Sequence, residues 1–150
     1  MYQSLSKIHT SLNISSVDNR FDFGKIEKEF DSNSYMSKII MDKNNCLNHF
    51  CNIGFQTFLN SQEEMDLLNK LNFEFHRIGI VNRNIQMVEP LLRDTHLLSV
   101  DFKSIKASEL NFAHNFPNGF ESDQICSISR YAGLSNSISA IGFFELLSSS

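Results

Sequence analysis

The chain has 150 residues, of which 41% are hydrophobic and 20% are charged, and its formal net charge is −4 at pH 7. This length and composition suit one globular domain and argue against a disordered chain. No segment has the lysine and arginine density that binding to nucleic acid requires, and no apolar run approaches the ~20 residues that cross a bilayer. We therefore expect neither a nucleic-acid partner nor a membrane segment. Three cysteines without C-x-x-C spacing predict buried thiols in a cytoplasmic protein.

Apolar periodicity and turn residues divide the chain into alternating helices and strands. Residues 2–11 are expected to form the end of a helix, and Ser61 is expected to begin another. Further helices are expected over 34–41, 84–93 and 123–132. The expected strands are 12–18, 52–56, the end of 74–80, 96–101 and 138–145. Ser61 and Glu64 have the spacing of a capping box. Gly133 is expected to end the last helix, and Cys126 is expected to face its buried side.

Strands that alternate with helices predict one mainly parallel sheet in a three-layer α/β/α fold. Ligands of such sheets bind beyond the carboxyl ends of the strands. The polar residues at those ends are Asp18, Asp101 and Glu145, and Asp22 adds a carboxylate just after the first strand.

Any one of these carboxylates could simply cap a following helix or face water. If Asp18, Asp22 and Asp101 converge, however, their repulsion raises their pKa values unless a cation compensates. Mn²⁺ and Mg²⁺ are the hard cations that clustered carboxylates bind.

Two motifs resemble those of the ureohydrolases, the family of arginase, agmatinase and formimidoylglutamase. Residues 17–22, V-D-N-R-F-D, resemble the family's D-A-H-x-D metal motif, and residues 98–103, L-S-V-D-F-K, resemble its S-x-D-x-D motif. Residues 117–145 resemble the late helix and strand of formimidoylglutamase-like members. The resemblance covers roughly residues 11–145, and it implies an arginase-like fold with a two-manganese centre that hydrolyses a C–N bond of a linear amidine or guanidine.

The resemblance assigns roles to single residues. It implies that Asp18 and Asp101 bridge the ions, that Asp22 completes one of them and that Glu145 contacts the amidine or guanidine of the substrate. Arg20 and Lys103 stand where the family has a metal-binding histidine and aspartate. Protonated arginine and lysine offer no lone pair to a metal.

We therefore expect the charges of Arg20 and Lys103 to pair with the bridging aspartates in place of the second ion. At most one weakly held Mn²⁺ should bind, and hydrolysis by this polypeptide should be low or absent. The histidines show no i, i+3 or i, i+4 pairing that would indicate a metal site. They are His9, His49, His76, His96 and His114.

The family's first metal histidine belongs to a glycine-rich motif that does not precede residue 12. We therefore interpret residues 1–150 as one ureohydrolase-like domain that is incomplete at both ends, and we expect its uncovered sheet to favour association into a homo-oligomer. The alternative is a non-catalytic remnant of the family that serves assembly or interaction.

Overall fold

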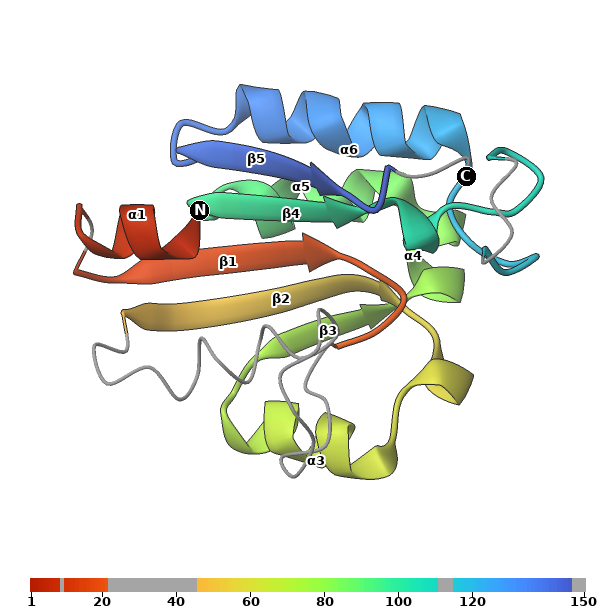
Figure 1. Ribbon diagram of the computed structural model, residues 1–150, viewed down its shortest axis with the longest axis horizontal. Helices are drawn as coiled ribbons and strands as arrows, with labels where there is room; N and C mark the ends of the chain where they lie inside the picture. Colours follow the sequence, from red (N-terminus) through yellow and green to blue (C-terminus); the bar gives the residue numbers. More distant parts are fainter. Residues whose placement is uncertain (9, 22–45, 111–114, 147–150) are drawn as a thin grey trace.

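Five parallel strands form one sheet at the centre of the molecule, in the order β3-β2-β1-β4-β5 (Figure 1). The computed structural model describes residues 1–8, 10–21, 46–110 and 115–146. The strands are β1 (Leu12–Val17), β2 (Leu47–Phe55), β3 (Glu74–Arg77), β4 (Leu97–Asp101) and β5 (Ala140–Phe144). The parallel α/β sheet predicted from the sequence is thereby confirmed.

Helices pack on both faces of this sheet and complete three layers. The helices of the described residues are α1 (Tyr2–Ser6), α3 (Gln62–Lys70), α4 (Ile78–Arg83), α5 (Val88–Leu92) and α6 (Ser122–Leu134). The short 3-10 turns are η2 (Thr57–Leu59), η3 (Ile85–Met87) and η4 (Phe102–Ser104). Side chains of α4, α5 and α6 share one apolar cluster with the sheet, and side chains of α1 and α3 share another.

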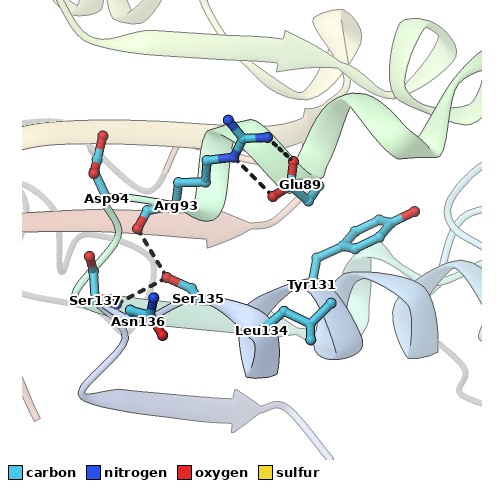
Figure 2. A pocket seen from close by; sticks show the side chains of 8 residues that line it. All are labelled: Glu89, Arg93, Asp94, Tyr131, Leu134, Ser135, Asn136 and Ser137. Carbon is cyan, nitrogen blue, oxygen red and sulfur yellow. Dashed lines mark hydrogen bonds and ion pairs between the residues drawn. The ribbon is translucent and has the colours of Figure 1, made fainter.

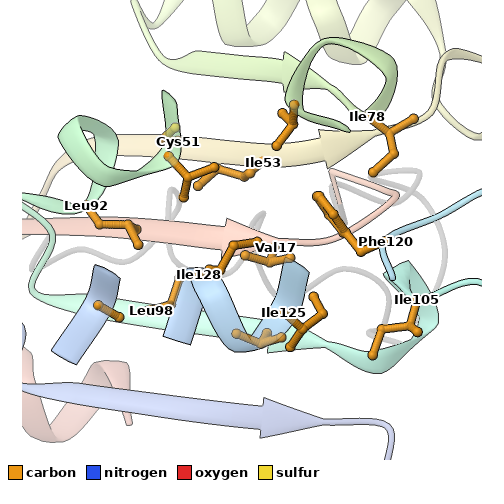
Figure 3. Close-up of a cluster of buried hydrophobic side chains, with 14 residues drawn as sticks. Val17, Cys51, Ile53, Ile78, Leu92, Leu98, Ile105, Phe120, Ile125 and Ile128 are labelled. Atoms are coloured by element: carbon orange, nitrogen blue, oxygen red, sulfur yellow. The ribbon is translucent and has the colours of Figure 1, made fainter. Parts of the chain in front are cut away.

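The larger cluster fills the space between the sheet and α4, α5 and α6 (Figure 3). Val17 of β1, Leu98 of β4 and Ile128 of α6 are fully buried in it. Ile14 points to the opposite cluster, because side chains alternate between the faces of a strand. Each fully buried side chain of this size stabilises the fold by about 1.5–3 kcal/mol.

Several predicted elements are confirmed with small shifts of their ends. The strands expected over 12–18 and 96–101 are β1 and β4, and the one expected over 52–56 is the second half of β2. Helix α3 begins with the predicted capping box. The Glu64 N–H donates to Ser61 Oγ at 3.2 Å, and the Ser61 N–H donates to Glu64 Oε2 at 2.7 Å.

The prediction for 74–80 is wrong in order, because the strand occupies its start and a helix its end. Ile78 and Val81 are both buried, and their i, i+3 spacing places them on one face of α4. Gly133 does not end α6, which continues to Leu134. Cys126 is exposed, because its neighbours Ile125 and Ile128 take the inward positions of α6. The helix expected over 34–41 lies outside the described residues.

β3 and β5 are the outer strands of the sheet in the described part of the chain. On β5, Phe143 and Phe144 are 42% and 47% exposed. In the same part of the chain, no helix has the length and apolar character needed to span a membrane.

Candidate functional site

Two neighbouring parallel strands bring Asp18 and Asp101 to the same edge of the sheet. Val17 of β1 is in register with Val100 of β4, and an aspartate follows each of them. Asp18 is 3% exposed, and Asp101 is half-buried. Both therefore lie at the carboxyl edge, where α/β sheets bind their ligands. Asp22 lies outside the described residues.

Tight turns fix one oxygen of each carboxylate. Asp18 Oδ1 accepts a hydrogen bond from the Arg20 N–H at 3.1 Å. Asp101 Oδ1 accepts one from the Lys103 N–H at 2.8 Å, and this bond caps η4. These are turns in which an aspartate bonds the backbone two residues on, and they orient the carboxylates without any contribution from a cation.

Electrostatics show that three carboxylates influence one another at this edge. The pKa of Asp101 is raised to about 7. Burial is the largest cause, and the charges of Asp18 and Glu145 act in the same direction. The hydrogen bond and the charge of Lys103 act in the opposite direction. The pKa of Asp101 is raised overall because burial and the two neighbouring carboxylates outweigh Lys103.

Glu145 follows the outer strand β5, and its carboxylate points to Lys103. Lys103 Nζ lies 3.3 Å from Glu145 Oε1, and the two side chains are 36% and 39% exposed. Lys103 belongs to η4 and not to β4, because the strand ends at Asp101. Glu145 has a φ of 57°, in the left-handed region that residues other than glycine seldom adopt.

Arg20 contacts the site through its backbone. Its N–H donates to Asp18, and its carbonyl accepts a hydrogen bond from Asn52 Nδ2 at 3.1 Å. The Arg20 residue itself is exposed. Arg20 and Lys103 were both expected to pair with the bridging aspartates. Within the described residues, the ammonium of Lys103 forms its ion pair with Glu145 instead.

Amide side chains connect the loops that follow β1, β2 and β4, and the sequence analysis did not identify them. Asn19 Nδ2 donates to the Lys103 carbonyl at 2.9 Å, and Gln56 Nε2 donates to the Asn118 carbonyl at 2.8 Å. Asn60 Nδ2 donates to the carbonyls of both Asn19 and Gln56. Asn19 directly follows the strand predicted over 12–18, and Gln56 is the last residue of the strand predicted over 52–56, so the strand-end rule that selected Asp18 could have selected them too.

Three oxygens of these amides have no hydrogen-bond donor among the described residues. They are Asn19 Oδ1, Asn52 Oδ1 and Gln56 Oε1. A buried oxygen without a donor costs free energy, which a bound cation or water can recover. Carboxylate and amide oxygens are the ligands of hard cations such as Mn²⁺. Asp18 and Asp101 offer carboxylate oxygens of this kind, whereas the protonated side chains of Arg20 and Lys103 offer no lone pair to an ion.

A pocket of about 410 Å³ lies elsewhere, at the edge where β4 and β5 begin (Figure 2). Glu89 and Arg93 form an ion pair in its wall at 2.8 Å, and Ser135 Oγ donates to the Arg93 carbonyl at 3.0 Å. The side chains of Glu89, Arg93 and Ser135 thus already have partners within this wall. The pocket is at the opposite edge from Asp18 and Asp101 and does not belong to their site.

Solved structures of two kinds of enzyme have a fold similar to that of this chain. The formimidoylglutamase of Bacillus subtilis subsp. subtilis str. 168 gives a TM-score of 0.82 at 17% identity, over 95% of this chain and 48% of that chain. The formiminoglutamase of Trypanosoma cruzi with Mn²⁺ gives 0.79 at 13% identity, over 91% and 49%. The arginase of Bacillus caldovelox gives 0.77 at 13% identity, over 94% and 55%.

No protein-family model matches the sequence, and no curated protein matches it significantly. The chain spans about half the length of the solved structures that it resembles. At these identities the likeness concerns the course of the backbone. The arginase-like fold that the sequence motifs implied is confirmed, because the chain shares the fold of these formimidoylglutamase and arginase structures.

Proposed function

We propose that this chain provides the metal- and substrate-binding edge of a hydrolase that cleaves a C–N bond in a linear amidine or guanidine. The observation that carries the proposal is the convergence of Asp18, Asp101 and Glu145 beyond the carboxyl ends of three strands. The similar solved structures are a formimidoylglutamase and an arginase, and a formiminoglutamase structure is described with Mn²⁺. Formimidoylglutamate-like and arginine- or agmatine-like compounds are the corresponding substrate class.

Asp18 and Asp101 would hold the cation. When bound, Mn²⁺ supplies a nucleophilic water at neutral pH. Because the pKa of Asp101 is about 7, a proton competes with the cation for this carboxylate near neutrality. Arg20 and Lys103 add positive charge where further ligands would be needed. We therefore propose at most one weakly held Mn²⁺.

Glu145 would bind the substrate cation. An amidinium or guanidinium group is planar and presents N–H donors in pairs, which a carboxylate accepts through both oxygens. Lys103 Nζ now neutralises Glu145, but the two side chains are more than a third exposed. Exposed ion pairs of this kind contribute only about 0–1 kcal/mol, so a substrate cation can take the place of the ammonium.

The Lys103–Glu145 ion pair also supports a second candidate function. If it persists, the proposed substrate carboxylate is already satisfied and the two replacement cations leave the metal site incomplete. The same chain would then be a non-catalytic protein of this fold that serves in assembly or interaction.

Calorimetric titration with Mn²⁺ tests the metal site. We expect at most one weak site in the wild type and its loss in Asp18→Asn and Asp101→Asn. Glu63→Gln, which removes an exposed carboxylate of α3, should bind like the wild type. Two tight sites, or binding that survives both aspartate substitutions, would contradict the assignment. Arg20→His combined with Lys103→Asp should increase Mn²⁺ uptake if these residues replace ligands.

Product release tests the reaction. The Mn²⁺-loaded chain should release formamide from formimidoylglutamate, or urea from arginine or agmatine, slowly and only while Glu145 is intact. Glu145→Gln should abolish the release and retain Mn²⁺ binding. If the wild type binds Mn²⁺ but hydrolyses none of these compounds, the hydrolase proposal fails and the non-catalytic function is supported.

A further inference from the structure

A second group of metal-ligating side chains lies on β2 and β3, and neither the sequence motifs nor the proposed hydrolysis uses it. Cys51 of β2 is in register with Glu74 of β3, and Ile53 is in register with His76. Because side chains alternate along a strand, Glu74 and His76 point to the same face as Cys51. The parallel pairing therefore brings the thiol of Cys51 next to a carboxylate and an imidazole that lie more than 20 positions further along the chain.

The donor atoms of this group are already close to one another. One ligand atom each from Cys51, Glu74 and His76 lies within 4.8 Å of the other two. His76 Nε2 is 3.3 Å from Glu74 Oε2, and His49 Nε2 is 3.7 Å from the other oxygen, Oε1. Ligands of a tetrahedral Zn²⁺ lie about 3.3–3.8 Å apart, given bond lengths of about 2.0–2.3 Å. Only small side-chain movements separate the observed group from that geometry.

Burial decreases across the group from the thiol to the carboxylate. Cys51 is 2% exposed and belongs to the larger apolar cluster, while the side chains of His76 and Glu74 are 24% and 50% exposed. The site thus has a buried sulfur at its base and an open side through which an ion can enter. An entry path and a complete donor set are the features that separate a metal site from a chance group of polar residues.

The chemistry of the three donors favours a cation between them. Cys51 and Glu74 are in register on neighbouring strands, so a thiolate formed at Cys51 would lie beside a carboxylate. A bound divalent cation supplies the missing positive charge, and the thiol gives up its proton to solvent as the metal–sulfur bond forms. Thiolate and imidazole ligands favour Zn²⁺ over Mn²⁺ or Mg²⁺.

We propose that Cys51, Glu74 and His76 form a site for a thiophilic divalent cation of the Zn²⁺ type, separate from the aspartate site. His49 holds the second oxygen of Glu74 and thereby orients this carboxylate toward the ion. Three protein ligands leave a fourth position for water or a small ligand. The site contains neither Asp18 nor Asp101, so a test of its metal binding does not depend on the proposed hydrolysis.

Titration of the metal-free chain with Co²⁺ tests this site, because a cobalt–thiolate bond produces a charge-transfer absorption that carboxylate and imidazole ligands do not produce. We expect the absorption to saturate at one Co²⁺ per chain and to vanish when Zn²⁺ displaces the cobalt. Cys51→Ala should abolish it. Cys126→Ala, which removes the exposed thiol of α6, should retain it. The double variant Asp18→Asn/Asp101→Asn should also retain it.

Variants at the open side of the group keep the test valid if Cys51→Ala fails to fold. Glu74→Gln and His76→Gln should each weaken Co²⁺ binding at least tenfold, because each removes a ligand. His49→Gln should weaken it about tenfold and retain the absorption, as expected for a residue that orients a ligand. Absence of the absorption in the wild type, its persistence without Cys51, or unchanged affinity in both Glu74→Gln and His76→Gln would overturn the proposal.

Discussion

Asp101 is a single residue whose raised pKa makes the stability of the fold depend on pH. Burial and the charges of Asp18 and Glu145 raise its pKa to about 7 from an ordinary 3.8. The folded chain therefore keeps this proton at a pH where the unfolded chain has lost it. It follows that the free energy of unfolding should fall as the pH rises from about 4 to about 7, and the loss should remain above pH 7.

Asp101→Asn should remove this loss. In metal-free protein we expect the variant to match the wild type at pH 4 and to exceed its free energy of unfolding by about 1–2 kcal/mol at pH 8, after solvent screening of a partly exposed carboxyl. Urea denaturation at both pH values measures the difference. Asp94→Asn removes one carboxylate at the opposite edge and controls for net charge. A variant less stable than the wild type at pH 8 would contradict the repulsion between Asp101 and its neighbours.

The positions of the two aspartates could be predicted from the sequence, because each follows an apolar run that is readable as a strand. The partner of Lys103 could not. Its ammonium reaches Glu145, and this contact depends on β5 pairing with β4 and on the chain turning into η4. The group around Cys51 was missed for a related reason, since spacing along one helix was considered and register between two strands was not.

At the scale of elements, β2 contains an irregularity that the sequence does not reveal. Pairing with β3 shifts between Ile53 and Phe55, and Gly54 between them has a φ of 100°. A Cβ built on Gly54 would lie 2.4 Å from the ring of Phe120. Both the backbone conformation and the close approach of this ring therefore require glycine.

Gly54→Ala should destabilise the fold by about 2–4 kcal/mol. The added methyl group would clash with the packed core, and alanine would be strained at the positive φ of this position. Gly133→Ala is the matched control. Gly133 lies exposed inside α6 with no atom within 4 Å of an added Cβ, so alanine should stabilise by about 0.5–1 kcal/mol. Thermal unfolding of both variants measures the two effects. Similar stability of the two variants would show that Phe120 can move away at little cost.

Helix α3 illustrates an element whose start the sequence does specify. The capping box of Ser61 and Glu64 depends only on residues three positions apart, so it can be recognised in the sequence without knowledge of any tertiary contact. Ser61→Ala should cost about 1 kcal/mol in the free energy of unfolding. Ser127→Ala, inside α6, should cost little and serves as the control in chemical denaturation. Equal costs would mean that the cap contributes nothing to stability. By contrast, the order of strand and helix in 74–80 was mispredicted, because a short apolar run is compatible with the residue periodicity of both a helix and a strand.

For the whole molecule, the outer strand β5 is the place where further chains can add. Phe143 and Phe144 expose apolar surface beside backbone groups that lack a further strand among the described residues. We predict concentration-dependent association of the chain, which sedimentation should detect. Phe144→Lys should reduce it, and Phe58→Lys, at an exposed site after β2, should not. A monomer at all concentrations would exclude association through β5.

The central place of β1 in the sheet has a consequence for biosynthesis. Ser15 of β1 shares a hydrogen bond with Thr95, 80 residues further along the chain, and β4 begins just after Thr95. A ribosome adds about 5–20 residues per second, so one side of β1 stays unpaired for about 4–16 s after it has been made. During that interval the nascent chain presents an unpaired strand edge and the apolar side chains of Leu12, Ile14 and Val17 to its surroundings. Chaperone binding should therefore concentrate on the nascent chain before β4 emerges and cease once β1 is enclosed.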